Sequence, residues 1–307
     1  MGRARRVRTL GPFMDGGMDA GGRWLRLAFV GPTLLFLVAF NVFPLAYNVV
    51  LGFTDAELVR RGWEWHGGAS YARLFADPEF AEAVRRTGLF VLMAVAIELA
   101  LGFGVALALR RRFRGRDALL TALLVPMMLS PAVMGLSWNL ILDGNYGILN
   151  HALAALGLPE PQWTTDRDLK FASILIIDVW MWTPFMLLVS MAALNAIPGT
   201  LYEAAEVDRA GPWTVFRRIT LPLCAPLLGL AALLRATDAW KQFDLVMAVT
   251  GANDSRTQTV STLLYQIVFR DHHVGLGSAY ACLVLVIVIA GATLFTRTLE
   301  HLQRRAA

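Results

Sequence analysis

Long apolar runs, separated by short segments rich in arginine, constrain the fold of this chain more than any other feature. A bilayer has a hydrocarbon core of about 30 Å, so a spanning helix needs about 20 mostly apolar residues. The stretches of suitable length are 27–50, 88–109, 119–142, 171–194, 223–249 and 278–296. With 56% of its 307 residues hydrophobic, the chain is too apolar to hide in one soluble core. We predict an all-α membrane protein with about six transmembrane helices.

The first and fifth runs need separate comment. The run 27–50 is longer than the apolar core of a secretory signal and lacks a small-residue cleavage site, so we expect it to be retained. The run 223–249 contains Arg235, Asp238, Lys241 and Asp244, which lower its hydropathy. Its length and its apolar first half still favour a span.

Lysine and arginine indicate the orientation, because cytoplasmic loops are enriched in these residues. They are most frequent in the terminal segment 1–26, after the second run, in 195–222 and in the tail 297–307. Both termini are therefore predicted to be cytoplasmic. The formal net charge of +5 does not indicate nucleic-acid binding, because the arginines flank apolar runs instead of following one helix face. Cys224 and Cys282 lie in or beside apolar runs without metal-ligand spacing, so no metal site is expected.

The segment 195–222 predicts a stiff helix-turn-helix on the cytoplasmic side. Pro198 and Thr200 favour a helix start, Gly211-Pro212 a break, and Pro222 the end of a second short helix. Small Ala204 and Ala205 allow another protein to approach closely. An amphipathic connector on the inner membrane surface is the alternative.

This segment resembles the coupling loop of ATP-binding-cassette (ABC) import permeases. The matching residues are Glu203, Ala204, Ala205, Asp208, Ala210, Gly211, Phe216, Ile219, Leu221 and Pro222. Arg209 departs from the family pattern, which has glycine there to permit a left-handed turn. Either Gly211 supplies the bend or the turn differs.

Downstream residues are similar to the sugar branch of this family, the relatives of maltose, trehalose and glycerol-phosphate permeases. They are Asp238, Phe243-Asp244, Thr250-Gly251, Thr257, Thr259, Leu264-Tyr265 and 274–279. The resemblance implies a type I ABC importer permease fold in the inner membrane of a bacterium or archaeon. It also implies a second homologous permease, two copies of an ATPase that carries ATP and Mg²⁺, and an extracytoplasmic sugar-binding protein. The implied cargo is a di- or oligosaccharide such as trehalose or maltose.

Two polar stripes are candidates for the substrate pathway. Asp178, Trp182 and Phe185 share one face of the fourth span, and Arg235, Ala239 and Gln242 repeat that spacing on the fifth. Aromatic rings stack on sugars while polar groups bond their hydroxyls, and the resemblance implies that both stripes line the pathway. The alternative for Asp238, Lys241 and Asp244 is neutralisation within the bundle, by pairs three residues apart: Arg235 with Asp238, and Lys241 with Asp244. Glu98 is expected to make a helix–helix hydrogen bond.

The chain lacks the Gly-x-x-x-x-Gly-Lys-Ser/Thr phosphate loop, so we expect no ATP or other cofactor on this subunit. No nucleophile lies in a recognisable motif, and catalysis is not expected. Two other functions are alternatives. An ion-driven transporter is expected to show inverted repeats, which are not evident. A membrane enzyme with Asp238 and Asp244 as acid and base needs both on one face, whereas six residues place them about 120° apart on a regular helix.

Overall fold

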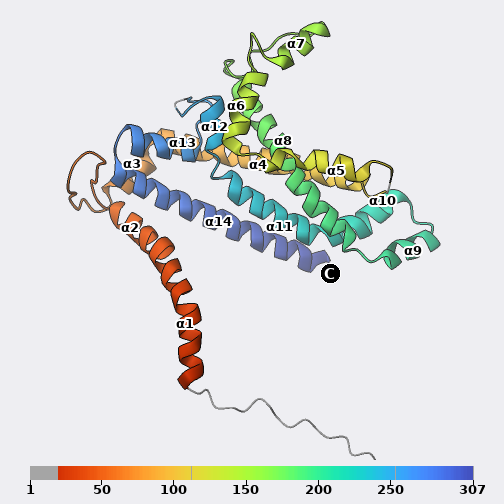
Figure 1. Ribbon diagram of the computed structural model, residues 1–307, viewed down its shortest axis with the longest axis horizontal. Helices are drawn as coiled ribbons and strands as arrows, with labels where there is room; N and C mark the ends of the chain where they lie inside the picture. Colours follow the sequence, from red (N-terminus) through yellow and green to blue (C-terminus); the bar gives the residue numbers. More distant parts are fainter. Residues whose placement is uncertain (1–19, 112, 253, 307) are drawn as a thin grey trace, which may run out of the picture. The chain divides into compact units, whose positions relative to one another are not determined.

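The computed structural model describes residues 20–111, 113–252 and 254–306, which form helices joined by turns and loops (Figure 1). Among these residues there is no strand, only an isolated bridge between Thr54 and Trp65. Most of the predicted terminal segment 1–26 and residue 307 lie outside the described residues. The chain divides into two units, 1–50 and 51–307, which we describe separately.

The described part of the first unit is helical. It comprises α1 (Ala20–Leu37), a π-helical turn (Val38–Val42) and α2 (Phe43–Leu51). The stretch Ala28–Leu51 is long and apolar enough to cross a membrane, and no residue of its most apolar part is buried by the chain itself. Phe29 and Leu35, for example, are 76% and 71% exposed. A helix that is apolar on all sides requires lipid or another protein around it, as expected for the predicted first span.

The second unit contains the remaining helices. They are α3 (Ala69–Ala76), α4 (Pro78–Ala108), α5 (Arg116–Leu124), α6 (Pro131–Ile141), α7 (Ile148–Ala155), α8 (Leu169–Asn195), α9 (Gly199–Val207), α10 (Pro212–Val215), α11 (Leu221–Ala239), α12 (Asp244–Val249), α13 (Val260–Tyr265) and α14 (Val274–Ala306). Within the described residues, this unit supplies four further helices able to span a membrane: Pro78–Ala108, Leu169–Asn195, Pro212–Ala239 and Val274–Thr298.

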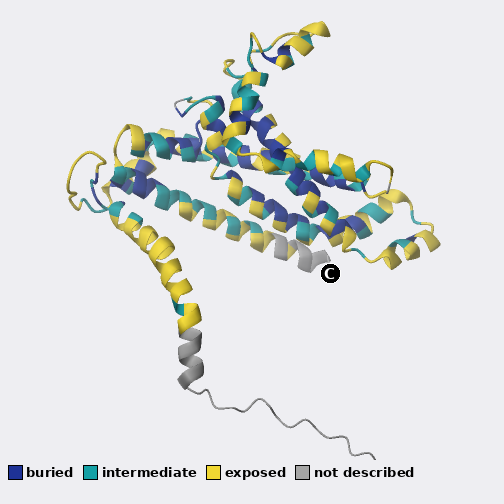
Figure 2. Cartoon of the chain, in the orientation of Figure 1, coloured by how far each residue is buried: buried dark blue, intermediate teal, exposed yellow. Residues whose placement is uncertain are grey.

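The centre of the second unit is formed by α4, α8 and α11, which pack against one another, while α14 lies along α11 (Figure 1). Buried residues concentrate on the facing sides of these helices, and α9 and α10 are mostly exposed (Figure 2). Gly102 of α4 allows the closest approach to α8. A Cβ at this position would lie 2.6 Å from the Cβ of Met186 and 2.7 Å from the backbone nitrogen of Leu187.

The structure corrects the predicted helix over 119–142. This stretch contains part of α5, a 3₁₀ turn (Pro126–Met128) and α6. Proline lacks an N–H donor and disfavours helical backbone in the residue before it. Ser130, before Pro131, is accordingly extended, with φ −65° and ψ 136°. Two prolines therefore divide one apolar run into two short helices.

The predicted helix over 223–249 is also shorter than expected. Helix α11 ends at Ala239, and a turn leads into the separate helix α12. The N–H groups of Lys241 and Gln242 bond back to the carbonyls of Asp238 and Ala239, at 3.0 and 3.2 Å. Of the charged residues that lower the hydropathy of this run, Arg235 and Asp238 lie in the last part of α11, Lys241 lies in the turn, and Asp244 begins α12.

Candidate functional site

The segment 195–222, which resembles a coupling loop and is called the coupling loop below for that reason, contains the predicted first helix and break, but not the predicted end. Helix α9 follows Pro198, and residues 208–211 separate it from α10. After α10 a π-helical turn (Phe216–Thr220) leads directly into α11. The N–H of Leu221 bonds to the carbonyl of Phe216, and this wider turn accommodates Pro222, which has no N–H to donate. The second helix therefore does not end at Pro222, as the sequence indicated, but joins the coupling loop to α11.

Arg209 itself makes the left-handed turn for which the resemblance led us to expect a glycine. Its φ is +50°, whereas Gly211 is extended, with φ −65° and ψ 155°. The N–H of Arg209 bonds to the carbonyl of Glu206 at 3.0 Å, and that of Ala210 bonds to Ala205 at 2.9 Å. These two bonds form a Schellman motif at the end of α9. The bend is thus at Arg209, and Gly211 does not supply it.

The exposed face of the coupling loop includes only one of the two alanines. Glu203, Ala204, Asp208, Arg209 and Gly211 are exposed. Ala205 is buried, at 8% exposure. The expectation that both alanines face a partner is therefore corrected: Ala204 lies on the open face, and Ala205 is covered by its own chain.

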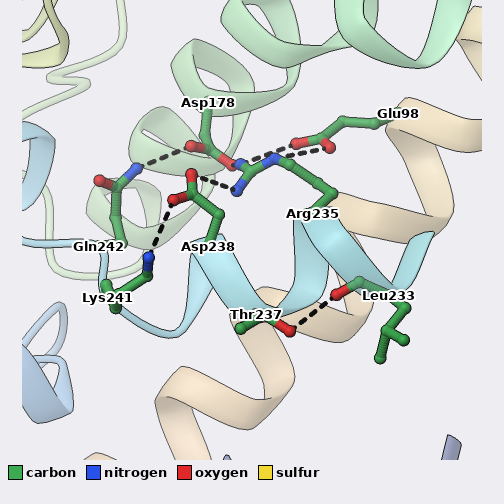
Figure 3. A network of polar contacts seen from close by, with 8 residues as sticks. All are labelled: Glu98, Asp178, Leu233, Arg235, Thr237, Asp238, Lys241 and Gln242. Carbon is green, nitrogen blue, oxygen red and sulfur yellow. Dashed lines mark hydrogen bonds and ion pairs between the residues drawn. The ribbon is translucent and has the colours of Figure 1, made fainter. Parts of the chain in front are cut away.

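A buried polar network joins the three central helices (Figure 3). Arg235 of α11 donates from Nε and from one terminal nitrogen to the two carboxylate oxygens of Glu98 on α4, at 3.0 and 3.1 Å. The same terminal nitrogen pairs with Asp178 on α8. Gln242 donates its amide to the other oxygen of Asp178 at 2.7 Å. One guanidinium therefore contacts a carboxylate from each of the other two central helices.

The burial of this network gives it a structural role. The side chains of Glu98 and Asp178 are 0% exposed and that of Arg235 is 2% exposed. Buried ions are tolerated only when paired and hydrogen-bonded, and losing one partner is strongly destabilising. The expectation that Glu98 makes a helix–helix hydrogen bond is confirmed. Its position as the ionisable residue in the middle of an apolar span was the sequence signal for such a partner.

Some residues of the two predicted stripes contact each other. The guanidinium of Arg235 lies 4.8 Å from the ring centroid of Trp182, and Gln242 reaches Asp178. Trp182, Phe185 and Gln242 are half-buried, whereas Ala239 is only 1% exposed. In this conformation, three of the six predicted pathway residues are thus buried by the chain itself.

Of the two pairs that the sequence spacing indicated, the structure shows Arg235 with Asp238 but places Lys241 beside Asp238 instead of Asp244. Lys241 lies 3.5 Å from Asp238, and Asp238 lies 3.8 Å from Arg235 (Figure 3). Asp244 is exposed at the start of α12. Asp238 therefore pairs with a cation on each side, and among the residues that the structure describes no ion pair joins Lys241 to Asp244.

A protein-family comparison decides the family. The family described as "Binding-protein-dependent transport system inner membrane component" matches residues 100–307, which include α8, the coupling loop and α11. This chain belongs to that family. It is therefore a permease subunit and not an enzyme, and the ATPase of such a transporter is a separate subunit.

Relatives of this permease include proteins described as sugar permeases. It is 35% identical to the trehalose/maltose permease MalF of Thermococcus litoralis over 73% of this chain and 76% of the relative. It is 30% identical to the trehalose permease SugA of Mycobacterium tuberculosis over 89% of this chain and 88% of the relative.

The fold is that of solved ABC importer permeases. A crystal structure of a bacterial alginate ABC transporter, in complex with an alginate pentasaccharide-bound periplasmic protein, matches with a TM-score of 0.82. That likeness covers 93% of this permease and 97% of the other chain at 19% identity. The predicted type I importer fold is thereby confirmed.

Proposed function

We propose that this permease imports a carbohydrate, a di- or oligosaccharide such as trehalose or maltose, in a transporter driven by ATP. The observation that carries this proposal is the coupling loop, a mostly exposed helix and turn whose residues match the family signature, on a chain whose relatives include proteins described as trehalose or maltose permeases. The transporter lies in the inner membrane of a bacterium or archaeon, with both termini cytoplasmic.

The proposed partners account for the steps that this chain has no residues to perform. A second homologous permease completes the pathway, and two copies of an ATPase bind ATP and Mg²⁺. An extracytoplasmic sugar-binding protein delivers the cargo. Closure of the ATPase pair pushes on the face around Glu203 and Ala204 and shifts the helices between inward-facing and outward-facing states.

The proposed pathway divides the six candidate residues into two layers. Trp182, Phe185 and Gln242 are accessible enough to touch a sugar, the rings by stacking and the amide by hydrogen bonding. Asp178, Arg235 and Ala239 lie behind them. Asp178 holds the Gln242 amide and Arg235 lies against the Trp182 ring, so the buried network orients the lining.

Uptake by the reconstituted transporter tests the proposal. We expect labelled trehalose or maltose to enter liposomes only with ATP on the ATPase side and binding protein on the other. Glu203→Arg and Ala204→Arg should abolish uptake and copurification of the ATPase while leaving the permease in the membrane. Ala204 is a better test than Ala205, because a large residue at buried Ala205 also disturbs the fold. Uptake that needs no ATP and follows an ion gradient would contradict the proposal.

A further inference from the structure

Tyr202, the residue directly before Glu203, contacts two other segments of the cytoplasmic side. Its ring centroid lies 3.9 Å from Cζ of Arg110, two residues beyond the end of α4. Its hydroxyl shares a hydrogen bond of 3.1 Å with Oγ1 of Thr220, the residue before α11. We propose that Tyr202 is the positioning residue that links the coupling helix α9 to both α4 and α11. This inference rests on the proposed function.

Both contact points of Tyr202 lie beside the ends of long helices. Thr220 is 3% exposed and belongs to the π-helical turn that runs without interruption into α11. Arg110 follows Leu109, whose carbonyl accepts a hydrogen bond of 2.8 Å from Nε of Arg116 at the start of α5. A displacement of α9 therefore reaches the ends of two long helices through one side chain.

The same two helices are also joined deeper in the bundle. The Arg235–Glu98 pair connects α11 with α4, and Asp178 connects α11 with α8. Since buried, hydrogen-bonded ion pairs resist separation, α4 and α11 respond to Tyr202 together. The two contacts of Tyr202 and the buried network then move the half-buried Trp182 and Gln242 with the coupling helix.

The experiment compares sugar imported per ATP hydrolysed in the complete reconstituted transporter. We expect Tyr202→Leu, which loses both contacts, to lower this ratio roughly five- to tenfold while the ATPase still copurifies and hydrolyses ATP. Tyr202→Phe and Thr220→Val remove the same hydrogen bond, so each should lower the ratio by the same smaller factor, and the double variant by no more. Arg110→Gln should lower the ratio, and Arg110→Lys should restore most of it.

Matched controls separate the linkage from general damage. Arg111→Gln and Arg114→Gln each remove a cation from an exposed residue of the loop that contains Arg110 and should leave the ratio unchanged. If Tyr202 has only a structural role, its variants lower the yield of assembled transporter but leave the sugar imported per ATP hydrolysed unchanged. That result overturns the inference. If Tyr202→Leu does not assemble, Tyr202→Phe and Arg110→Gln decide the question. If the wild-type transporter imports sugar without ATP, the proposed function itself is overturned. If the wild type needs ATP and the Tyr202 variants import as much sugar per ATP as it does, only the role of Tyr202 is overturned.

Discussion

Arg209 ends the coupling helix in a backbone conformation that crowds the Cβ of any L-residue. A left-handed conformation costs a non-glycine residue about 1–2 kcal/mol, and the Schellman bonds from Arg209 and Ala210 hold it in place. This exposed arginine therefore maintains a strained turn on the surface that we propose for ATPase docking.

Arg209→Gly should stabilise the end of α9 by about 0.5–1 kcal/mol, because the relief of strain exceeds the added freedom of the unfolded chain. Hydrogen exchange measures this directly: the amide of Ala210 should exchange more slowly. Arg209→Ala is the matched control, because it loses the same charge but keeps a Cβ in the left-handed turn. Equal protection in both variants would show that charge, not backbone strain, governs this turn.

Arg235 is the second residue whose loss has a clear expected effect. Arg235→Met leaves the buried carboxylates of Glu98 and Asp178 without their cation, and should destabilise the permease by about 3–5 kcal/mol. Glu98→Gln keeps an oxygen acceptor and removes one of two negative charges, so its cost should be far smaller. Thermal unfolding in detergent compares the two variants. A similar loss of stability in both variants would show that the contribution of Glu98 is not limited to being one of two carboxylates bound by Arg235.

At the scale of the helices, close approach between α4 and α8 depends on a missing side chain. Gly102 faces Met186 and Leu187 at distances that no Cβ tolerates, whereas Gly104, two residues along the same helix, has nothing within 4 Å of its Cβ position. The two glycines therefore have opposite expected responses to the same substitution.

Gly102→Ala should destabilise the permease by about 1–3 kcal/mol, because α4 and α8 must move apart. Gly104→Ala should be neutral or stabilising by up to about 1 kcal/mol, because alanine favours a helix interior. The midpoint of thermal unfolding distinguishes these results. Destabilisation by Gly104→Ala equal to that by Gly102→Ala would contradict the observed packing of the two helices.

At the scale of the whole chain, the distribution of lysine and arginine predicts which loops face the cytoplasm. The coupling loop should be inside, and the loop containing Asn145, between α6 and α7, should be outside. Both Asn145 and Glu206 are exposed, so a label can reach either residue from its own side of the membrane.

Cysteine labelling of intact cells tests this orientation, in a background with Cys224 and Cys282 replaced by alanine. A membrane-impermeant maleimide should modify Asn145→Cys and not Glu206→Cys, and permeabilised cells should show labelling at both. The reverse pattern would invert the predicted topology and place the coupling loop away from any cytoplasmic ATPase.

The sequence by itself determined the apolar helices and the coupling loop, because hydropathy, proline positions and the Glu203-Ala204-Ala205 spacing are local properties. The break within 119–142 is also a local property, because Pro126 and Pro131 cause it, but the high hydropathy of the run indicated one continuous helix. Tertiary structure alone decided which carboxylates surround Arg235. Sequence spacing favoured Asp238, three residues away, whereas the hydrogen-bonded partners are Asp178 and Glu98, separated from Arg235 by 57 and 137 residues. Only helix packing brings such groups together, since the low-dielectric interior makes a buried charge depend on its neighbours in space.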